Sequence, residues 1–297
     1  MRYAKPPLSL DDQAALMVQC GMRGDVALMK ERLASVSYYR LSGYWYPFRN
    51  TDDTFKPGTT FDKVWERYVL DRRLRILLMD ALERIEIAVR TQLSYHHAHG
   101  FGAFGYASSP ASLPKLTAPD RQKLVDRVRD EVSRSKEKFV GHFRLKYGDT
   151  HTDLPIWMAT EVMTFGSVLT LFRGCPRQVK KAVASHFGVP DEVMDSWLLA
   201  LNAVRNICAH HGRLWNRELG VKPFIPRVYR YPQWHSPVRV ENNRIFGILT
   251  ICKHCLDRVA PQSAWRARVR ELLNQHPAIP LRNMGFPDNW ADCAVWK

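Results

Sequence analysis

The segment DRRLRILLMDALERIEIAVRTQL, residues 71–93, lies in the longest helical pattern of the 297-residue chain. Apolar side chains recur close to a helical period from about Phe61 to about Ala98, which predicts one long helix. These side chains are Val64, Tyr68, Leu70, Leu74, Leu77, Leu78, Leu82, Ile85 and Val89. The polar side of the same helix carries Glu86 and Arg90 one turn apart, a spacing that favours an ion pair. We expect this helix to be the backbone of the fold.

The helical period also dominates the rest of the chain. Further helices are expected at about residues 11–21, 25–41, 120–146, 155–172, 176–187, 191–211, 240–259 and 262–275. Stretches with the strict two-residue alternation of half-buried strands are not convincing anywhere. Segment 155–172 is apolar nearly all round, so its Glu161 is expected to be buried and to need a partner. The sequence therefore predicts an all-α fold.

Prolines are concentrated beyond Gly220, at positions 223, 226, 232 and 237. Such a run interrupts helices because proline lacks the backbone N–H and clashes with the preceding turn. It predicts two parts: a main helical body over residues 1–225 and a helical C-terminal extension over residues 226–297. No internal repeat is recognisable.

The chain is strongly basic, with 44 Lys and Arg against 29 Asp and Glu, a formal charge of +15 and a sequence pI near 9.7. A molecule of this charge attracts polyanions, with nucleic acid as the leading partner and an anionic membrane surface as the second. The alternative is that arginine-rich composition reflects a GC-rich genome and involves no ligand. Concentrated amphipathic lysine and aromatic patterns are not evident, so membrane binding is not expected.

Neither a membrane span nor a signal peptide is evident from the pattern of apolar residues. No run approaches the ~20 apolar residues that cross a bilayer, and the N-terminus MRYAKPPLSL lacks an apolar core. The six cysteines are scattered, so reduced thiols in the cytoplasm are expected. Cys252 and Cys255 form a lone CxxC around His254, and a zinc site there would need further ligands. The chain has neither a P-loop nor a dinucleotide-binding fingerprint, so we expect no organic cofactor and no metal.

The most informative polar cluster lies in SWLLALNAVRNICAHHGRLWN, residues 196–216. In a regular helix Asn206 and His210 share one face, whereas Arg205 and His210 lie roughly 140° apart around the axis. Arg205 and His210 can therefore meet at one ligand only if the helix loosens before Gly212, or if the site is assembled across a two-fold dimer.

These residue types suit metal-independent cleavage of RNA. A histidine can take the 2′-hydroxyl proton or protonate the leaving 5′-oxygen, because its ordinary pKa of about 6.5 lies near operating pH. Arginine donates two hydrogen bonds to a phosphate, and Asn206 could orient the phosphate or a ring. The structural alternative is that His and Arg at a helix end bond the last carbonyls and stabilise the helix dipole.

RNICAHHGRLWN, residues 205–216, resembles the C-terminal signature of the Abi-like family, the AbiD and AbiF type of phage abortive-infection protein. The resemblance extends over roughly residues 10–225, through SYYRLSGYWYPFR (37–49), the long helix (71–93) and WMATEVMTFGSVLTLF (157–172). Abi-like proteins are similar to the HEPN superfamily. This implies a HEPN-type helical bundle, here with additional peripheral helices, which frequently dimerises.

In active HEPN members an R-x4-to-6-H motif supports metal-independent ribonuclease activity that leaves a cyclic phosphate. The resemblance implies that Arg205 and His210 form this motif, with Asn206 as its polar residue. Secondary candidates are His211, Glu86 and Arg90, and the residues expected to contact RNA are Arg213 and Arg217. The expected partners are a second copy and cellular RNA, phage RNA or a structured small RNA. Because some HEPN members only bind RNA or a protein, a non-catalytic regulatory module is the alternative.

Overall fold

A computed structural model describes residue 2 and residues 6–297 of the chain. Over these residues the fold is all-α, as predicted, and only two isolated bridges, Arg23 with Thr60 and Arg49 with Phe55, have strand-like pairing. The assignment to the HEPN type stays a prediction. The longer helices are α1 (Leu10–Gln19), α2 (Val26–Ser35), α3 (Tyr38–Trp45), α4 (Phe61–Phe101), α6 (Ala118–Arg134), α7 (Lys138–Tyr147), α8 (Ile156–Val162), α9 (Phe165–Gly174), α10 (Arg177–His186), α11 (Asp191–Ala209), α12 (Ile245–Val259) and α13 (Trp265–Asn274).

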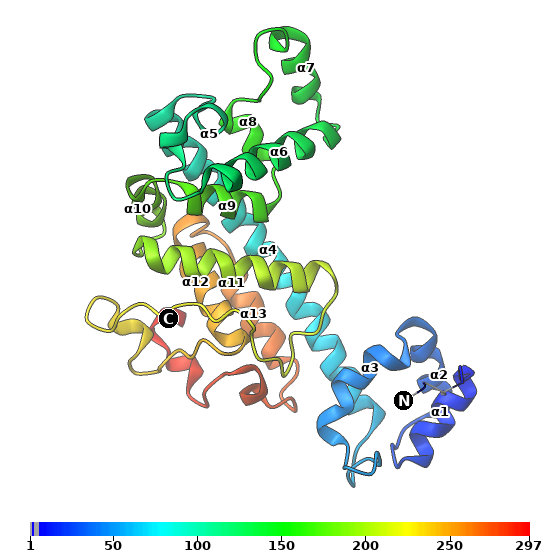
Figure 1. The fold of residues 1–297 in the computed structure, drawn as a ribbon. Helices are drawn as coiled ribbons and strands as arrows, with labels where there is room; N and C mark the ends of the chain where they lie inside the picture. Colours follow the sequence, from blue (N-terminus) through cyan, green and yellow to red (C-terminus); the bar gives the residue numbers. More distant parts are fainter. Residues whose placement is uncertain (1, 3–5) are drawn as a thin grey trace.

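Helix α4, 41 residues long, is the axis of the molecule (Figure 1). It begins after Thr60, whose hydroxyl accepts a hydrogen bond from the Lys63 amide, and it ends at Gly102, whose φ of 74° leaves the helical range. Helices α1–α3 lie near its beginning and α5 (Gly105–Ser108) to α8 lie near its end. The predicted long helix is therefore confirmed, and it runs three residues beyond the expected end.

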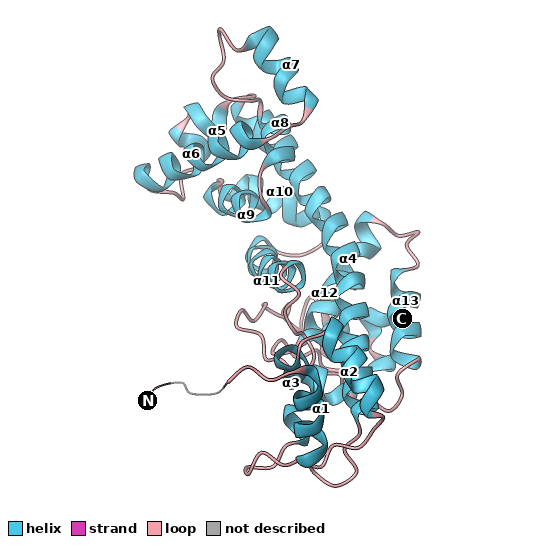
Figure 2. Cartoon of the chain, turned by 90° about the vertical axis from the view of Figure 1, so that its right-hand side faces the viewer, coloured by secondary structure: helices cyan, strands magenta, loops and turns pink. Residues whose placement is uncertain are grey.

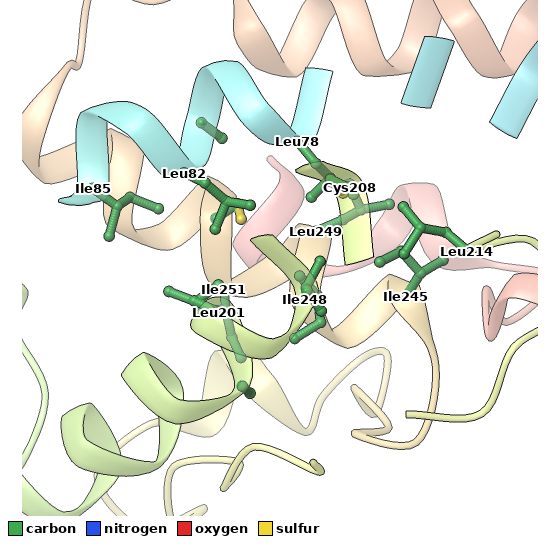
Figure 3. Close-up of a cluster of buried hydrophobic side chains, with 14 of the residues drawn as sticks. Leu78, Leu82, Ile85, Leu201, Cys208, Leu214, Ile245, Ile248, Leu249 and Ile251 are labelled. Carbon is green, nitrogen blue, oxygen red and sulfur yellow. The ribbon is translucent and has the colours of Figure 1, made fainter. Parts of the chain in front are cut away.

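The central core lies between α4, α11 and α12 (Figure 3). Leu78 and Leu82 of α4, Leu201 of α11 and Ile248 of α12 are all buried there. The C-terminal helices also contact α4, and the Trp265 indole N–H of α13 donates to the Leu77 carbonyl. The proposed division of the chain at residue 225 stays a prediction, but the helices that follow it help to bury the long axis helix.

Three of the expected helices are each divided into two. Ser37 and Thr164 cap α3 and α9, because their hydroxyls accept hydrogen bonds from the Arg40 and Ser167 amides. Helix α6 likewise ends at Arg134, before the extended residue Ser135. A serine or threonine hydroxyl that accepts a hydrogen bond from a nearby backbone amide can end one helix and start the next. The spacing of apolar residues does not reveal such a hydrogen bond.

Segment 155–172 shows one consequence of such a division. Helix α8 ends at Val162, and the chain turns at Met163 before α9 begins. Glu161 is exposed in the last turn of α8, so the expectation of a buried Glu161 was wrong. The apolar pattern belongs to two short helices with different buried faces rather than to one helix buried all round.

His97 of α4 is a fully buried histidine. Over the part of the chain that the structure describes, neither ring nitrogen has a hydrogen-bond partner. Burial lowers the pKa of His97 to about 4, because a charged imidazolium would lose its hydration. Neutral His97 therefore keeps its full contribution to stability above pH 6.5, and this contribution is lost as pH falls towards 4.

We expect acidification from pH 7 to pH 5 to cost the folded state about 2 kcal/mol through His97 alone. The free energy of unfolding, measured by chemical denaturation at both values, should fall more in the wild type than in His97→Leu. The difference between the two proteins isolates His97 from other titrating groups. Equal falls in both proteins would show that His97 does not carry the pH dependence.

Candidate functional site

Helix α11 lies beside α4 and α12, and Figure 2 views it nearly along its axis. Arg205 of α11 faces α4, where its Nε lies 3.9 Å from Glu86 Oε2. Glu86 also pairs with Arg90, whose guanidinium donates to the Thr160 carbonyl of α8. Glu86 and Arg90 are largely buried and Arg205 is half-buried. The structure thus brings Arg205 together with both secondary candidates from α4.

Asn206 and His210 are placed differently, because both are exposed at the last turn of α11. Helix α11 ends at Ala209, and His210 is its C-cap, with its amide donating to the Asn206 carbonyl. Within residues 6–297, the side chains of Asn206 and His210 make no hydrogen bond or ion pair. The His210 amide keeps the helical bond to Asn206, and the chain leaves helical geometry only at His211, so the convergence of Arg205 and His210 on one ligand stays a prediction.

His211 closes α11 with a Schellman motif. The Gly212 amide donates to the Ile207 carbonyl at 2.7 Å and the His211 amide donates to the Cys208 carbonyl at 3.0 Å. This motif places its C′ residue in the left-handed region, and His211 has a φ of +58°. Glycine is usual at C′ because a Cβ there costs energy. His211 therefore occupies a position where stability alone favours glycine.

We expect His211→Gly to raise the free energy of unfolding by roughly 0.5–1 kcal/mol, because glycine removes the left-handed strain. Denaturant unfolding of the two proteins would measure this gain. Arg217→Ala, a nearby exposed substitution, serves as the control and should leave stability nearly unchanged. A loss of stability in His211→Gly would mean that the imidazole makes a compensating contact.

The segment after α11 is anchored by the buried carboxylate of Asp71 on α4. Its Oδ1 accepts the backbone amides of Leu214 and Trp215, at 3.0 and 2.7 Å. Its Oδ2 accepts the Tyr44 hydroxyl at 2.6 Å and also pairs with Arg75. Burial raises the pKa of Asp71, and these donors and the guanidinium oppose that shift. The carboxylate thereby fixes the path of the chain leaving His210.

Helix α3 contributes two residues that sequence reasoning missed. The Arg40 guanidinium donates to the His211 carbonyl at 2.7 Å, across 171 positions of sequence. Tyr39 precedes it and is 88% exposed. Both lie in the segment 37–49, which resembled the family, but no local pattern pairs that segment with the end of α11. The structure therefore adds a cation of α3, Arg40, to the surroundings of His211 and places the exposed ring of Tyr39 on the same neighbouring helix.

The two arginines predicted to contact RNA differ in the contacts that they make within the protein. The Arg213 guanidinium donates to the Trp215 carbonyl at 2.9 Å and packs against α3 at Gly43, where a Cβ would lie 3.2 Å from Arg213 Nε. Arg217 is exposed, and its guanidinium lies 3.4 Å from the Arg213 carbonyl. Arg213 thus has a structural bond to maintain, and Arg217 is the more available cation.

The CxxC of α12 belongs to the core. Cys252 and Cys255 are fully buried, and burial raises the pKa of both thiols. The intervening His254 ring nitrogen Nε2 lies 2.9 Å from the Phe187 carbonyl. In the described portion of the chain no group of three or more His, Cys, Asp or Glu is arranged to hold a metal ion. No helix there is long and apolar enough to cross a membrane.

Comparison with known proteins assigns a family to most of the chain. A family model described as Abi-like protein matches residues 31–216, which include α4, α11 and the whole cluster around Arg205 and His210. No curated protein matches the chain, nor does any solved structure. The match covers more than half of the chain and agrees with the resemblance carried by RNICAHHGRLWN.

Proposed function

Because this chain belongs to the Abi-like protein family, an abortive-infection family, we propose that it acts in phage defence as a metal-independent endoribonuclease in the cytoplasm. Its catalytic residues would be Arg205, Asn206 and His210. The observation that carries the proposal is the placement of a half-exposed Arg205, held beside Glu86, in the same final turns of α11 that expose His210.

The charge balance around Arg205 supports a role with phosphate. Glu86 is the only carboxylate within ion-pair distance of Arg205 in the described residues, and it is shared with Arg90. One negative charge between two guanidinium groups leaves a net positive charge. The 3.9 Å separation is too long for a hydrogen bond, so Arg205 keeps N–H donors for a ligand. Arg205 is thus positioned by Glu86 without being neutralised.

The proposed chemistry follows from these groups. His210 takes the proton of the 2′-hydroxyl, and the 2′-oxygen attacks the adjacent phosphorus. The bond to the 5′-oxygen breaks, and that oxygen is protonated by a second acid, either His211 or His210 of a second copy. Arg205 stabilises the charge that builds on the phosphate and Asn206 orients it. The products are a 2′,3′-cyclic phosphate and a 5′-hydroxyl.

The surroundings of this site favour an RNA strand as substrate. Tyr39 offers an exposed ring for stacking a base, and Arg217 offers a cation for a neighbouring phosphate. The formal charge of +15 would draw RNA of cellular or phage origin to the protein. We include a homodimer in the proposal, because a second copy would supply the second histidine.

The test is incubation of purified protein with total RNA and tRNA in excess chelator, beside His210→Ala. We expect chelator-resistant fragments with cyclic phosphate ends from the wild type and none from the variant. Arg134→Ala, which removes an exposed guanidinium on the remote α6, is the matched control and should cleave normally. Equal cleavage by His210→Ala would refute the site assignment, and cleavage that stops with chelator would refute the metal-independent mechanism.

A non-catalytic RNA-binding or regulatory module is the second candidate. It is favoured by the exposure of Asn206 and His210, whose side chains have no hydrogen bond over residues 6–297 that would orient them for catalysis. Such a module would bind RNA in a salt-sensitive manner, and binding would survive His210→Ala without fragments appearing. A structured small RNA could then hold the protein inactive until infection.

A further inference from the structure

A concave surface lies at the opposite end of α11 from His210. It is a cavity of about 640 Å³ between α10, the first turn of α11 and the segment Arg227–Tyr231. Its volume is in the range of small-molecule sites. The 19 residues of α11 separate the two ends by about 28 Å. The cavity therefore shares no residue with the Arg205 site and can be tested independently of it.

The cavity carries an excess of positive charge. Its two carboxylates, Asp191 and Glu192, both pair with Arg177, at 3.1 and 3.4 Å. The other cationic residues in the lining are Lys181, Arg227 and Arg230. None of these three has a carboxylate partner among the residues that the structure describes. An anionic group entering the cavity would therefore meet cations that no ion pair already neutralises.

Two tyrosines line the same cavity as these cations. Tyr229 is 69% exposed and the Arg230 guanidinium carbon lies 5.8 Å from the centre of its ring. Tyr231 is half-buried in the same lining. Rings that alternate with arginines are typical of surfaces that stack bases while holding phosphates. A binding site for a simple polyanion would need only the cations, so the tyrosines favour a ligand with a flat ring.

The segment that carries these tyrosines is closed by a turn and is anchored to α11 just before it. The amides of Arg230 and Tyr231 both donate to the Arg227 carbonyl, which closes a turn with Tyr229 near its tip. Before this turn, the Trp197 indole N–H of α11 donates to the Phe224 carbonyl at 2.8 Å. These bonds restrict the backbone of the segment before a ligand arrives, which lowers the entropy cost of binding.

We propose that this cavity binds a nucleoside phosphate unit. Tyr229 stacks on the base, and Lys181 and Arg230 bind the phosphate. Glu192, whose side chain is largely exposed, is available to accept a hydrogen bond from a ribose hydroxyl. The unit has two possible sources, a single-stranded RNA or a free nucleotide. Binding here does not depend on cleavage at His210, so it holds or fails separately from the proposed function.

The test measures binding in the full-length His210→Ala protein, so that cleavage cannot remove the probe. Fluorescence anisotropy with a labelled ten-nucleotide single-stranded RNA and competition by adenosine monophosphate form its two arms. We expect Tyr229→Ala to weaken binding about tenfold or more in at least one arm, and Tyr229→Phe to retain it. Because Tyr229 is largely exposed, its replacement leaves the core intact.

A second variant tests the contribution of the cationic side chains to phosphate binding. Lys181→Ala combined with Arg230→Ala should weaken oligonucleotide binding and reduce the slope of log affinity against log salt by about 1.4. Arg134→Ala on α6 is the matched control for loss of an exposed cation. Displacement by the mononucleotide would identify a nucleotide site, and binding of the oligonucleotide alone would identify an RNA site. Unchanged binding in Tyr229→Ala and in the charge variant would overturn the proposal.

Discussion

Replacement of Asp71 by alanine is expected to lower the free energy of unfolding by about 3–5 kcal/mol. The substitution removes the acceptor of two backbone amides and of the Tyr44 hydroxyl, all in the interior. It also leaves the Arg75 guanidinium buried without its counter-charge. Each abandoned donor loses its hydrogen bond without regaining water. Chemical denaturation monitored by circular dichroism would measure the loss.

Asp130→Ala is the matched control, because Asp130 also pairs with an arginine four residues away but both side chains are exposed. Exposed pairs of this kind contribute little, so a change below about 1 kcal/mol is expected. Similar losses in the two variants would contradict the role given to Asp71. A second readout is available if Asp71→Ala remains folded, because the segment after His210 should then exchange its amide hydrogens faster.

Replacement of Arg205 by alanine should lower the rate of RNA cleavage by about 100- to 1,000-fold. This follows from the proposed function, in which Arg205 donates to the phosphate as charge develops. Because Arg205 is half-exposed and its ion pair with Glu86 is 3.9 Å long, the variant should keep nearly all of its stability. Single-turnover cleavage of a labelled RNA, together with an unfolding curve, separates the chemical effect from the structural one.

Two further variants sharpen this prediction. Arg205→Lys keeps the charge but loses the planar fork, so it should recover only part of the rate. Glu86→Gln removes the carboxylate that Arg205 and Arg90 share, and should lower stability because Arg90 is largely buried. Its effect on cleavage should be smaller than that of Arg205→Ala, since Glu86 positions the guanidinium and does not touch the substrate. Wild-type rates in Arg205→Ala would exclude Arg205 from the mechanism.

The fold could be predicted from sequence wherever periodicity is long and uninterrupted. The apolar positions between Phe61 and Ala98 predict the long helix almost to its ends. The divisions before α3 and α9 were missed, because a single hydroxyl that bonds its own backbone leaves the apolar pattern unchanged. Local hydrogen bonds of this kind decide boundaries more than they decide the fold class.

The same distinction holds for the candidate site: spacing along one helix could be read from the sequence, and contacts between helices could not. The Arg205 and His210 cluster and the Glu86–Arg90 pair were each apparent from spacing along one helix. Their meeting across α4 and α11 is a tertiary contact between residues more than 100 positions apart, which no period reports. The Arg40 bond to the His211 carbonyl was inaccessible for the same reason. Sequence therefore suggested the reactive groups, and the packing of helices determines which of them become neighbours.

The position of α12 in the chain has a consequence for synthesis on the ribosome. Leu78 and Leu82 of α4 pack with α12, yet α12 is complete only on the order of 150 residues after α4 ends. At typical elongation rates this delay is about 10–30 s. In the last third of that time the nascent chain already carries Arg205 and His210 while part of its axis helix is uncovered. The complete central core, and the geometry it imposes on α11, can form only after translation has passed α12.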